Sequence, residues 1–340
     1  MANFLMVKDP PQQVVGSCNI SGLKVICSIV FVLSSMSLFC GCASDSHPFT
    51  KDWPPKQGSY ENVLDKQRRG LAMEEVPGEE PDMTAEEHER LGDQYLQQGN
   101  MDESFVQYYK ALNLNPGETG VRYKMGLLFL RKGLPDGALK EFQEILKEDD
   151  SYALAYEGAG QAFMQMGEYD EAEKRFQKAL QLDPDLWLSH NNLGMIYDRK
   201  FRFDDAIAHY ETAITIKPNQ DILLNNLGLS YYLNGEYLKS VDTLLKAAQA
   251  GSNPKNAKVY NNLGLALGKL QRYDEALEAF KKAGDRAAAY NNLGYVYFLQ
   301  KEYDKAIVSF EKAIEIKPSF YQSANENLKM SRKALADVVE

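Results

Sequence analysis

Cysteine and histidine have the widest chemical repertoire among side chains, and both are scarce in this 340-residue sequence. All four cysteines, Cys18, Cys27, Cys40 and Cys42, lie in the first 42 residues. The rest of the chain therefore cannot form a disulfide framework, a CxxC redox pair or a thiolate metal site. Clustering of this kind indicates a processed N-terminal segment.

The histidines do not suggest a metal centre. They are His47, His88, His190 and His209, and no two of them have the spacing of metal ligands. We interpret them as structural or surface residues, with His190 in a packing position. The segment Gly264–Lys269 has the glycines and lysine of a phosphate loop, but it is too short and no Ser or Thr follows. The sequence contains no nucleophile elbow or HExxH motif, so we expect no enzyme, cofactor, metal or small-molecule substrate.

Charge excludes a further class of partner. The net charge is −10 at pH 7, so nothing in the composition would broadly neutralise a phosphate backbone. We therefore expect no nucleic-acid partner. The charged fraction of 25% and the apolar fraction of 44% are ordinary for a folded soluble protein.

Amide side chains offer binding chemistry in place of catalysis. Four asparagine pairs recur: Asn191-Asn192, Asn225-Asn226, Asn261-Asn262 and Asn291-Asn292. An amide donates and accepts hydrogen bonds at once, so a row of such side chains could hold an extended peptide with little regard to its side chains. The alternative is that these residues only support packing by bonding to neighbouring backbone. The two roles are compatible.

Each asparagine pair is followed by Leu-Gly, and this motif marks an internal repeat. Its glycines are Gly92, Gly126, Gly160, Gly194, Gly228, Gly264 and Gly294. The first four intervals are 34 residues, the next is 36 and the last is 30. Other positions recur in register, including a small residue that begins at Ser104 and an aromatic or Leu residue that begins at Tyr108.

The spacing of the apolar residues predicts two amphipathic helices in each repeat. Glycine and alanine lie where the two helices should approach most closely, and the aromatic side chains should fill the gaps between them. Thr84 and Glu87 predict a capping box ahead of the first helix. An aspartate near the start of most second helices, such as Asp102 and Asp170, is expected to cap that helix.

A period of 34 residues with this residue pattern resembles the tetratricopeptide repeat family, over residues 85–320. The resemblance implies an all-α, right-handed superhelical solenoid of seven helix pairs that serves as a non-enzymatic protein-binding scaffold. The predicted repeats are 85–118, 119–152, 153–186, 187–220, 221–256, 257–286 and 287–320, and the sixth is shortened around Gly284. Residues 321–340, with Ala324, Leu328, Leu335 and Val338 on one face, predict a capping helix that covers the last apolar surface.

The N-terminus has the order of a secretory signal. Lys24 precedes an apolar run from Val25 to Phe39, which at about 15 residues is short for a membrane span. The sequence that follows Leu38 resembles a bacterial lipobox that ends in Gly41 and Cys42. That resemblance implies a signal peptide at 1–41, lipidation and acylation (palmitate) of Cys42, and the outer membrane as destination. An uncleaved signal anchor and an ordinary secretory signal are the alternatives. Residues 42–83, rich in Pro and Gly, predict a flexible tether.

In the tetratricopeptide family the first helices line a concave groove, and the resemblance assigns the asparagine pairs to it. Apolar residues share the predicted groove: Met195, Leu229, Tyr232, Leu265, Tyr295 and Phe298. Some of these are expected to be packing residues, and the others predict a groove for an amphipathic or extended segment. The acidic N-terminal repeats, which contain Glu86, Glu89 and Asp93, lack this character. We therefore place the predicted site in repeats four to seven.

The combination of signal, tether and repeats resembles lipoproteins that assist pilus and secretion machinery, including the tight-adherence (Flp-type) class. The resemblance implies a protein on the periplasmic face of the outer membrane whose partners are other envelope proteins, such as pilus or secretin components. An adaptor for cell-wall enzymes or exopolysaccharide export is the alternative function. Architecture alone does not fix a partner.

Overall fold

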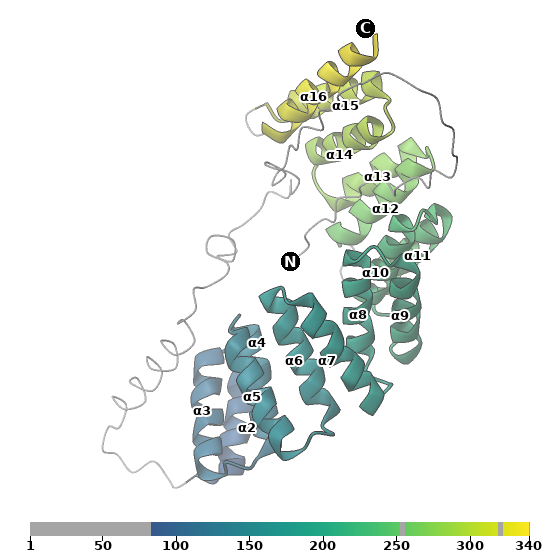
Figure 1. The fold of residues 1–340 in the computed structure, drawn as a ribbon. Helices are drawn as coiled ribbons and strands as arrows, with labels where there is room; N and C mark the ends of the chain where they lie inside the picture. Colours follow the sequence, from purple (N-terminus) through teal and green to yellow (C-terminus); the bar gives the residue numbers. More distant parts are fainter. Residues whose placement is uncertain (1–82, 252–255, 319–321, 340) are drawn as a thin grey trace, which may run out of the picture. The chain divides into compact units, whose positions relative to one another are not determined.

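The computed structural model describes residues 83–251, 256–318 and 322–339, and these residues form helices joined by short turns (Figure 1). Seven antiparallel helix pairs and a final helix follow one another along the chain. The pairs are α2 (Ala85–Gln97) and α3 (Met101–Leu114), α4 (Thr119–Arg131) and α5 (Pro135–Glu148), α6 (Ala153–Met166) and α7 (Tyr169–Leu182), α8 (Trp187–Arg199) and α9 (Phe203–Ile216), α10 (Asp221–Leu233) and α11 (Tyr237–Ala250), α12 (Ala257–Lys269) and α13 (Tyr273–Ala283), and α14 (Arg286–Leu299) and α15 (Tyr303–Ile316), before α16 (Gln322–Val339). The predicted all-α fold of seven helix pairs and a C-terminal helix is confirmed.

The described chain divides into two compact units at Leu227 and Gly228, within α10. The N-terminal unit holds α2 to α9 and the first part of α10, and the C-terminal unit holds the rest of α10 and α11 to α16. In each unit, helices that are adjacent in sequence pack against each other and bury most of their apolar side chains between them.

The repeated glycine lies where the two helices of a pair meet, as predicted. A Cβ atom added to Gly160 would lie 2.7 Å from the ring of Phe176, and one added to Gly126 would lie 2.6 Å from the ring of Phe142. Both rings are fully buried. Only glycine leaves room for a ring at this distance, so the glycine and the aromatic residue are a single packing device repeated along the chain.

The helix starts correct one prediction. Thr84 and Glu87 do form the capping box, with both reciprocal hydrogen bonds present. The aspartates do not cap the second helices: Asp102 and Asp170 lie inside the first turn, and the N-cap residues Asn100 and Glu168 make no side-chain cap hydrogen bond. The prediction was wrong because the helices begin before the aspartates. Each of these two aspartates instead adds a negative charge to a helix N-terminus, which the helix dipole favours.

The turn inside each repeat needs a left-handed residue. Glycine fills this place in four repeats, for example Gly167 with φ of 82°. Phe201, Gln271 and Lys301 fill it in the other three, with φ between 59° and 63°. A side chain at positive φ is strained, so these three turns are less stable than their glycine counterparts.

The C-terminal end largely follows the prediction. Helix α13 has 11 residues where the other second helices have 14, which is the predicted shortening ahead of Gly284. In α16, Ala324 and Leu328 are buried in clusters formed with α14 and α15. Val338 is 70% exposed, so its predicted place on the packing face is wrong. The helix extends beyond the surface that it covers.

The predicted signal peptide and almost all of the predicted tether lie outside the described residues. Among the helices that the structure describes, none is both long and apolar enough to cross a membrane.

Candidate functional site

The asparagine pairs form hydrogen bonds to one another across neighbouring repeats. In the N-terminal unit, Asn226 Nδ2 on α10 donates to Asn191 Oδ1 on α8 at 2.9 Å. Asn191 Nδ2 in turn approaches Asn192 Oδ1 at 3.4 Å. Asn191 is only 4% exposed and Asn192 is also buried, whereas Asn225 and Asn226 are half-buried.

The C-terminal unit repeats this arrangement twice. Asn292 Nδ2 on α14 donates to Asn261 Oδ1 on α12 at 3.1 Å. Asn327 Nδ2 on α16 donates to Asn291 Oδ1 on α14 at 3.2 Å. Asn262 and Asn291 are buried, whereas Asn261 and Asn292 are half-buried. Asn327 extends the series beyond the four predicted pairs.

A single rule describes the three bonds. The second asparagine of one repeat, or its counterpart Asn327, donates to the first asparagine of the preceding repeat. The sequence predicts amide bonds to a peptide or to neighbouring backbone, and the bonds between amide side chains are an addition that the structure makes. The signal was present, because the paired residues are 31 to 36 positions apart, about one repeat.

These bonds constrain what the amides can do. A carbonyl oxygen that accepts from the next repeat fixes the orientation of its amide group, whose NH₂ then has a defined direction. Asn261 and Asn292 reach solvent, so they can also meet a ligand. The buried Asn191 and Asn291 serve inter-repeat packing, because burial leaves them little contact with solvent.

The predicted apolar residues lie on the same four helices as the asparagine pairs, α8, α10, α12 and α14. Met195 is 41% exposed in the N-terminal unit. The other five are half-buried and belong to the C-terminal unit: Leu229, Tyr232, Leu265, Tyr295 and Phe298.

The aromatic residues in this set are anchored on one side. Tyr295 and Phe298 pack against a buried cluster that includes Phe310, and the ring centroid of Tyr232 lies 5.7 Å from that of Tyr237. Burial raises the pKa of Tyr295 above its ordinary value. Rigid, half-buried aromatic side chains are well suited to binding because they lose little entropy on contact.

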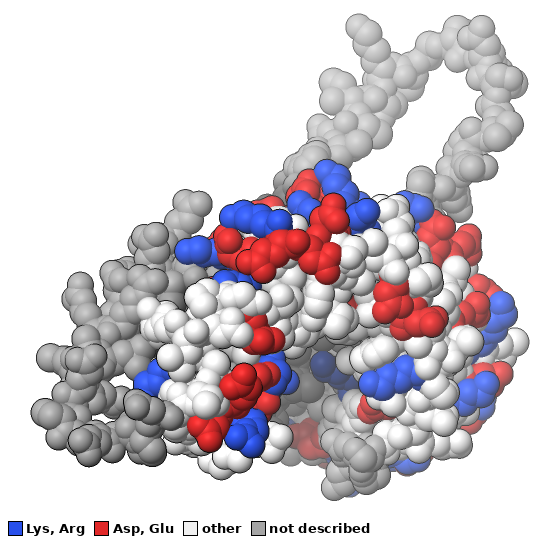
Figure 2. Space-filling model, turned by 90° about the horizontal axis from the view of Figure 1, so that it is seen from below, with Lys and Arg blue, Asp and Glu red and all other residues white. Residues whose placement is uncertain are grey.

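The first repeats have a polar surface instead. Lys124 Nζ lies 2.7 Å from both Glu89 Oε1 and Asp93 Oδ2, so two of the three predicted acidic residues are paired across repeats. Acidic and basic side chains also lie intermixed on the face that Figure 2 shows.

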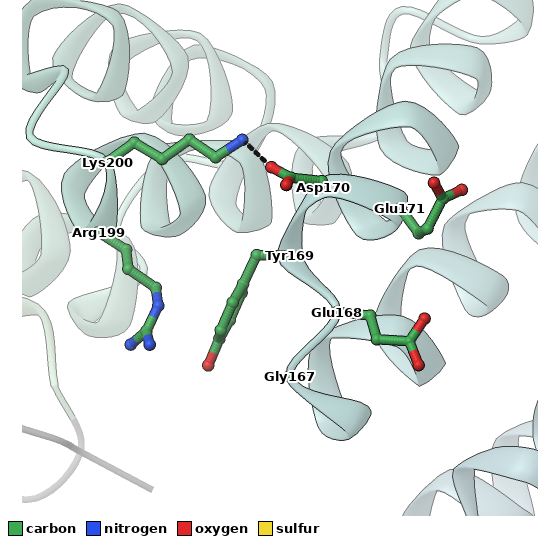
Figure 3. Close-up of a pocket in the computed structure, with 7 residues that line it drawn as sticks. All are labelled: Gly167, Glu168, Tyr169, Asp170, Glu171, Arg199 and Lys200. Carbon is green, nitrogen blue, oxygen red and sulfur yellow. Dashed lines mark hydrogen bonds and ion pairs between the residues drawn. The ribbon is translucent and has the colours of Figure 1, made fainter.

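A pocket in the N-terminal unit is lined by residues of the turn between α6 and α7 and of the end of α8 (Figure 3). Arg199 points towards the ring of Tyr169, with its guanidinium carbon 4.3 Å from the ring centroid. Lys200 forms an ion pair with Asp170, whereas Glu171 points away from them. Both basic residues of this pocket therefore already have partners within it. In the part of the chain that the structure describes, no group of three His, Cys, Asp or Glu side chains could hold a metal ion.

Comparison with protein families identifies the repeats. Residues 57–292, well over half of the chain, match the family model of the cilia and flagella-associated protein 70 C-terminal domain. Residues 287–320 match the model of the tetratricopeptide repeat. The chain belongs to the tetratricopeptide repeat family. A fold of this family is typically a non-enzymatic scaffold suited to protein binding.

Solved structures share the fold. A tetratricopeptide repeat protein from Parabacteroides merdae is 15% identical with a TM-score of 0.51, over 73% of this chain and 98% of that one. The pilF protein of Pseudomonas aeruginosa is 19% identical with a TM-score of 0.50, over 73% and 96%. Part of a repeat protein from Cytophaga hutchinsonii is 18% identical with a TM-score of 0.52, over 70% and 98%. At these identities the likeness is one of fold. Comparison with curated proteins gives no match.

Proposed function

We propose that this tetratricopeptide protein is a lipid-anchored envelope scaffold that holds peptide segments of pilus or secretion components. The observation that carries the binding proposal is the series of asparagine bonds between repeats. The bond from Asn292 fixes the amide group of the half-buried Asn261, and the aromatic anchors Tyr295 and Phe298 lie on α14, the helix that carries Asn292. Fixed amides can recognise a peptide backbone, and neighbouring apolar surface can receive its side chains.

The amide contribution can be tested with Asn261→Ala. The full-length protein and the variant would be compared by affinity capture of envelope proteins after chemical crosslinking. We expect the variant to lose the partner that the wild type captures, because both the ligand-facing amide and the acceptor for Asn292 are removed. The matched control is Asn115→Ala, because Asn115 is an exposed residue of the N-terminal unit whose amide bonds only to Glu118. Capture that Asn261→Ala leaves unchanged would exclude the amide contribution.

The aromatic contribution needs a separate variant. Phe298→Ala removes a half-buried ring that packs on the cluster of Ala306, Phe310 and Leu328. We expect weaker capture by this variant, with an intact helical circular dichroism spectrum. Tyr303→Ala is the control for loss of the contact between the rings of Phe298 and Tyr303, whose centroids are 5.6 Å apart. Equal capture by wild type and Phe298→Ala would contradict an apolar groove in the C-terminal unit.

The anchor rests on the Gly41-Cys42 motif after the apolar run. Cys42→Ser should abolish metabolic labelling with a fatty acid and release the protein from the membrane fraction, whereas Cys40→Ser should not. One acyl chain binds a membrane only marginally, so stable attachment would require the several chains of a bacterial lipoprotein. Equal labelling of wild type and Cys42→Ser would rule out the anchor and leave the groove proposal untouched.

The pilus or secretion role rests on the combination of signal, tether and repeats, because the likeness to pilF is a likeness of fold. An adaptor for cell-wall enzymes or exopolysaccharide export would use the same anchor and groove. Identification of the crosslinked partner distinguishes the two, since a pilus or secretin subunit supports the first and a cell-wall or export enzyme supports the second.

A further inference from the structure

Two histidines that are 19 residues apart in sequence meet between α8 and α9. His190 Nδ1 lies 2.9 Å from His209 Nδ1, and His190 Nε2 lies 3.2 Å from the Pro184 carbonyl oxygen. A carbonyl oxygen only accepts, so His190 Nε2 carries a hydrogen. In the neutral state His190 Nδ1 therefore accepts, and His209 Nδ1–H donates to it.

In the first two repeats, other residues occupy the positions equivalent to His190 and His209. His88 Nδ1 lies 2.7 Å from the amide oxygen of Gln107, and Arg122 Nη1 lies 3.0 Å from a carboxylate oxygen of Glu141. Arg122 also donates to the carbonyl of Pro116, as His190 does to that of Pro184. In both of these repeats the second helix supplies a fixed acceptor that tolerates a cation. In the fourth repeat the second helix, α9, supplies His209, a second imidazole that can itself become a cation.

Ring geometry favours a hydrogen bond over a metal. The ring centroids are 5.1 Å apart and the two nitrogens 2.9 Å apart, a difference of 5.1 − 2.9 = 2.2 Å. That difference is about the sum of the two ring radii, so the rings meet end to end along the line that joins their nitrogens. Two lone pairs on one metal ion would instead converge at an angle.

Two of the three carboxylates near the histidine pair already have basic partners, and Tyr197 on α8 packs against the His209 ring with centroids 5.3 Å apart. On α7, Glu173 is paired with Lys200 at 2.6 Å, and on α9 Asp205 is paired with Arg202 at 2.7 Å. Asp185, exposed before α8, is the remaining carboxylate near His190. Burial lowers the pKa of His190. Burial, followed by the charge of His190, lowers the pKa of His209 to about 4.

We infer that His190 and His209 form a pH-sensitive latch, which joins the two helices of the fourth repeat and opens when both imidazoles are protonated. A first proton can bind His209 Nε2 and leave the bond between the two Nδ1 atoms intact. A second proton must bind His190 Nδ1, the acceptor itself. Two Nδ1–H groups and two positive charges then face each other, and the bond is lost.

The direction of the pH effect follows from these protonation states. An imidazole in the unfolded chain titrates near about 6.5, above its folded pKa in this site. The unfolded state therefore binds more protons below about pH 6.5. The latch contributes fully above that pH, and its contribution is lost as the pH falls towards the pKa of about 4 of His209.

The experiment is hydrogen–deuterium exchange of the full-length protein at pH 7.5 and 5.0, with labelling times matched for intrinsic exchange. Protection of α8 and α9, taken relative to α4 and α5 of the same molecule, should fall about thirtyfold, because pH 5.0 lies about 1.5 units below the pKa of one exposed imidazole and above the folded pKa of His209. His209→Gln recreates the pair of the first repeat, and His190→Arg with His209→Glu recreates that of the second. Both variants should keep their relative protection at pH 5.0.

Two results would overturn the latch. One is an equal loss of relative protection in wild type and in the double variant, which has no imidazole in this place. The other is a loss caused by EDTA alone at pH 7.5, which would make the pair a metal site. If His209→Gln fails to fold, the double variant still decides the question, because its ion pair has the charge types of the Arg122–Glu141 pair.

Discussion

Removal of the last bond in the asparagine series gives the sharpest test of what that series does. Asn327→Ala takes away the donor to Asn291 Oδ1, which lies 3.2 Å away. Asn327 is 3% exposed and Asn291 is 6% exposed, so water cannot easily replace the lost donor. An unsatisfied buried acceptor costs about 1–3 kcal/mol, and we expect a loss of unfolding free energy in that range.

Asn292→Ala is the matched comparison. It removes an equivalent bond, at 3.1 Å, from Asn261 Oδ1. Asn261 and Asn292 are half-buried, so water can occupy the place of the lost amide. We therefore expect a loss of about 0.5–1 kcal/mol, smaller than that of Asn327→Ala.

The assay is guanidinium unfolding followed by circular dichroism, with hydrogen exchange of α14 and α16 to locate the effect. A double-mutant cycle with Asn291→Ala isolates the pair, and we expect a coupling of about 0.5–1.5 kcal/mol. A coupling near zero, or an equal loss from Asn292→Ala and Asn327→Ala, would refute the argument that burial of the acceptor sets the cost.

Three other predictions use unfolding free energy. Gly160→Ala places a Cβ 2.7 Å from the ring of Phe176 and should cost about 1–3 kcal/mol by overpacking, measured by urea unfolding. Gln271→Gly relieves a backbone φ of 59° and should stabilise the protein by about 0.5–1 kcal/mol, visible as a higher thermal midpoint; a lower midpoint would show that the glutamine side chain matters more than the strain. Burial raises the pKa of Glu157, so the folded state favours its protonated form. Glu157→Gln should therefore stabilise the protein at pH 7.5, and the gain should shrink as the pH falls through the raised folded pKa and be lost near the unfolded pKa of about 4.3; an equal gain in urea unfolding above and below this window would contradict this cause.

The fold was predictable because the same residue types recur at the same packing positions in each repeat. Gly160 and Phe176 show why: the close approach that permits only glycine is filled by a bulky side chain opposite, a ring in six repeats and Leu244 in the fifth, and both positions recur in register. The prediction that aspartates cap the second helices was wrong because helix boundaries depend on backbone geometry at the turn, which residue type only weakly constrains. The prediction that Val338 lies on the packing face was wrong because helical spacing assigns a residue to a face of the helix but does not tell how far the neighbouring helices extend along it.

The candidate site was only half predictable. Its residues followed from their recurrence, but the bonds between them join Asn226 to Asn191 across a whole repeat. Predicting such a bond requires the relative rise and rotation of adjacent repeats, which a single sequence does not contain. The meeting of His190 with His209 was missed for a related reason: 19 residues is not a metal-ligand spacing, and it becomes a contact only once two helices fold back on each other.

The asparagine series separates two requirements that a binding scaffold must satisfy together. A repeat array needs neighbouring units to agree in register, and a buried amide pair such as Asn291 and Asn327 penalises any misalignment by leaving polar atoms unsatisfied. A ligand needs amides that are oriented before it arrives, and the half-buried pair of Asn261 and Asn292 meets that need with the same bond. Position along the array, through burial, thus decides which role a given pair performs. Loss of stability should accordingly track the buried pairs, and loss of ligand should track the half-buried ones.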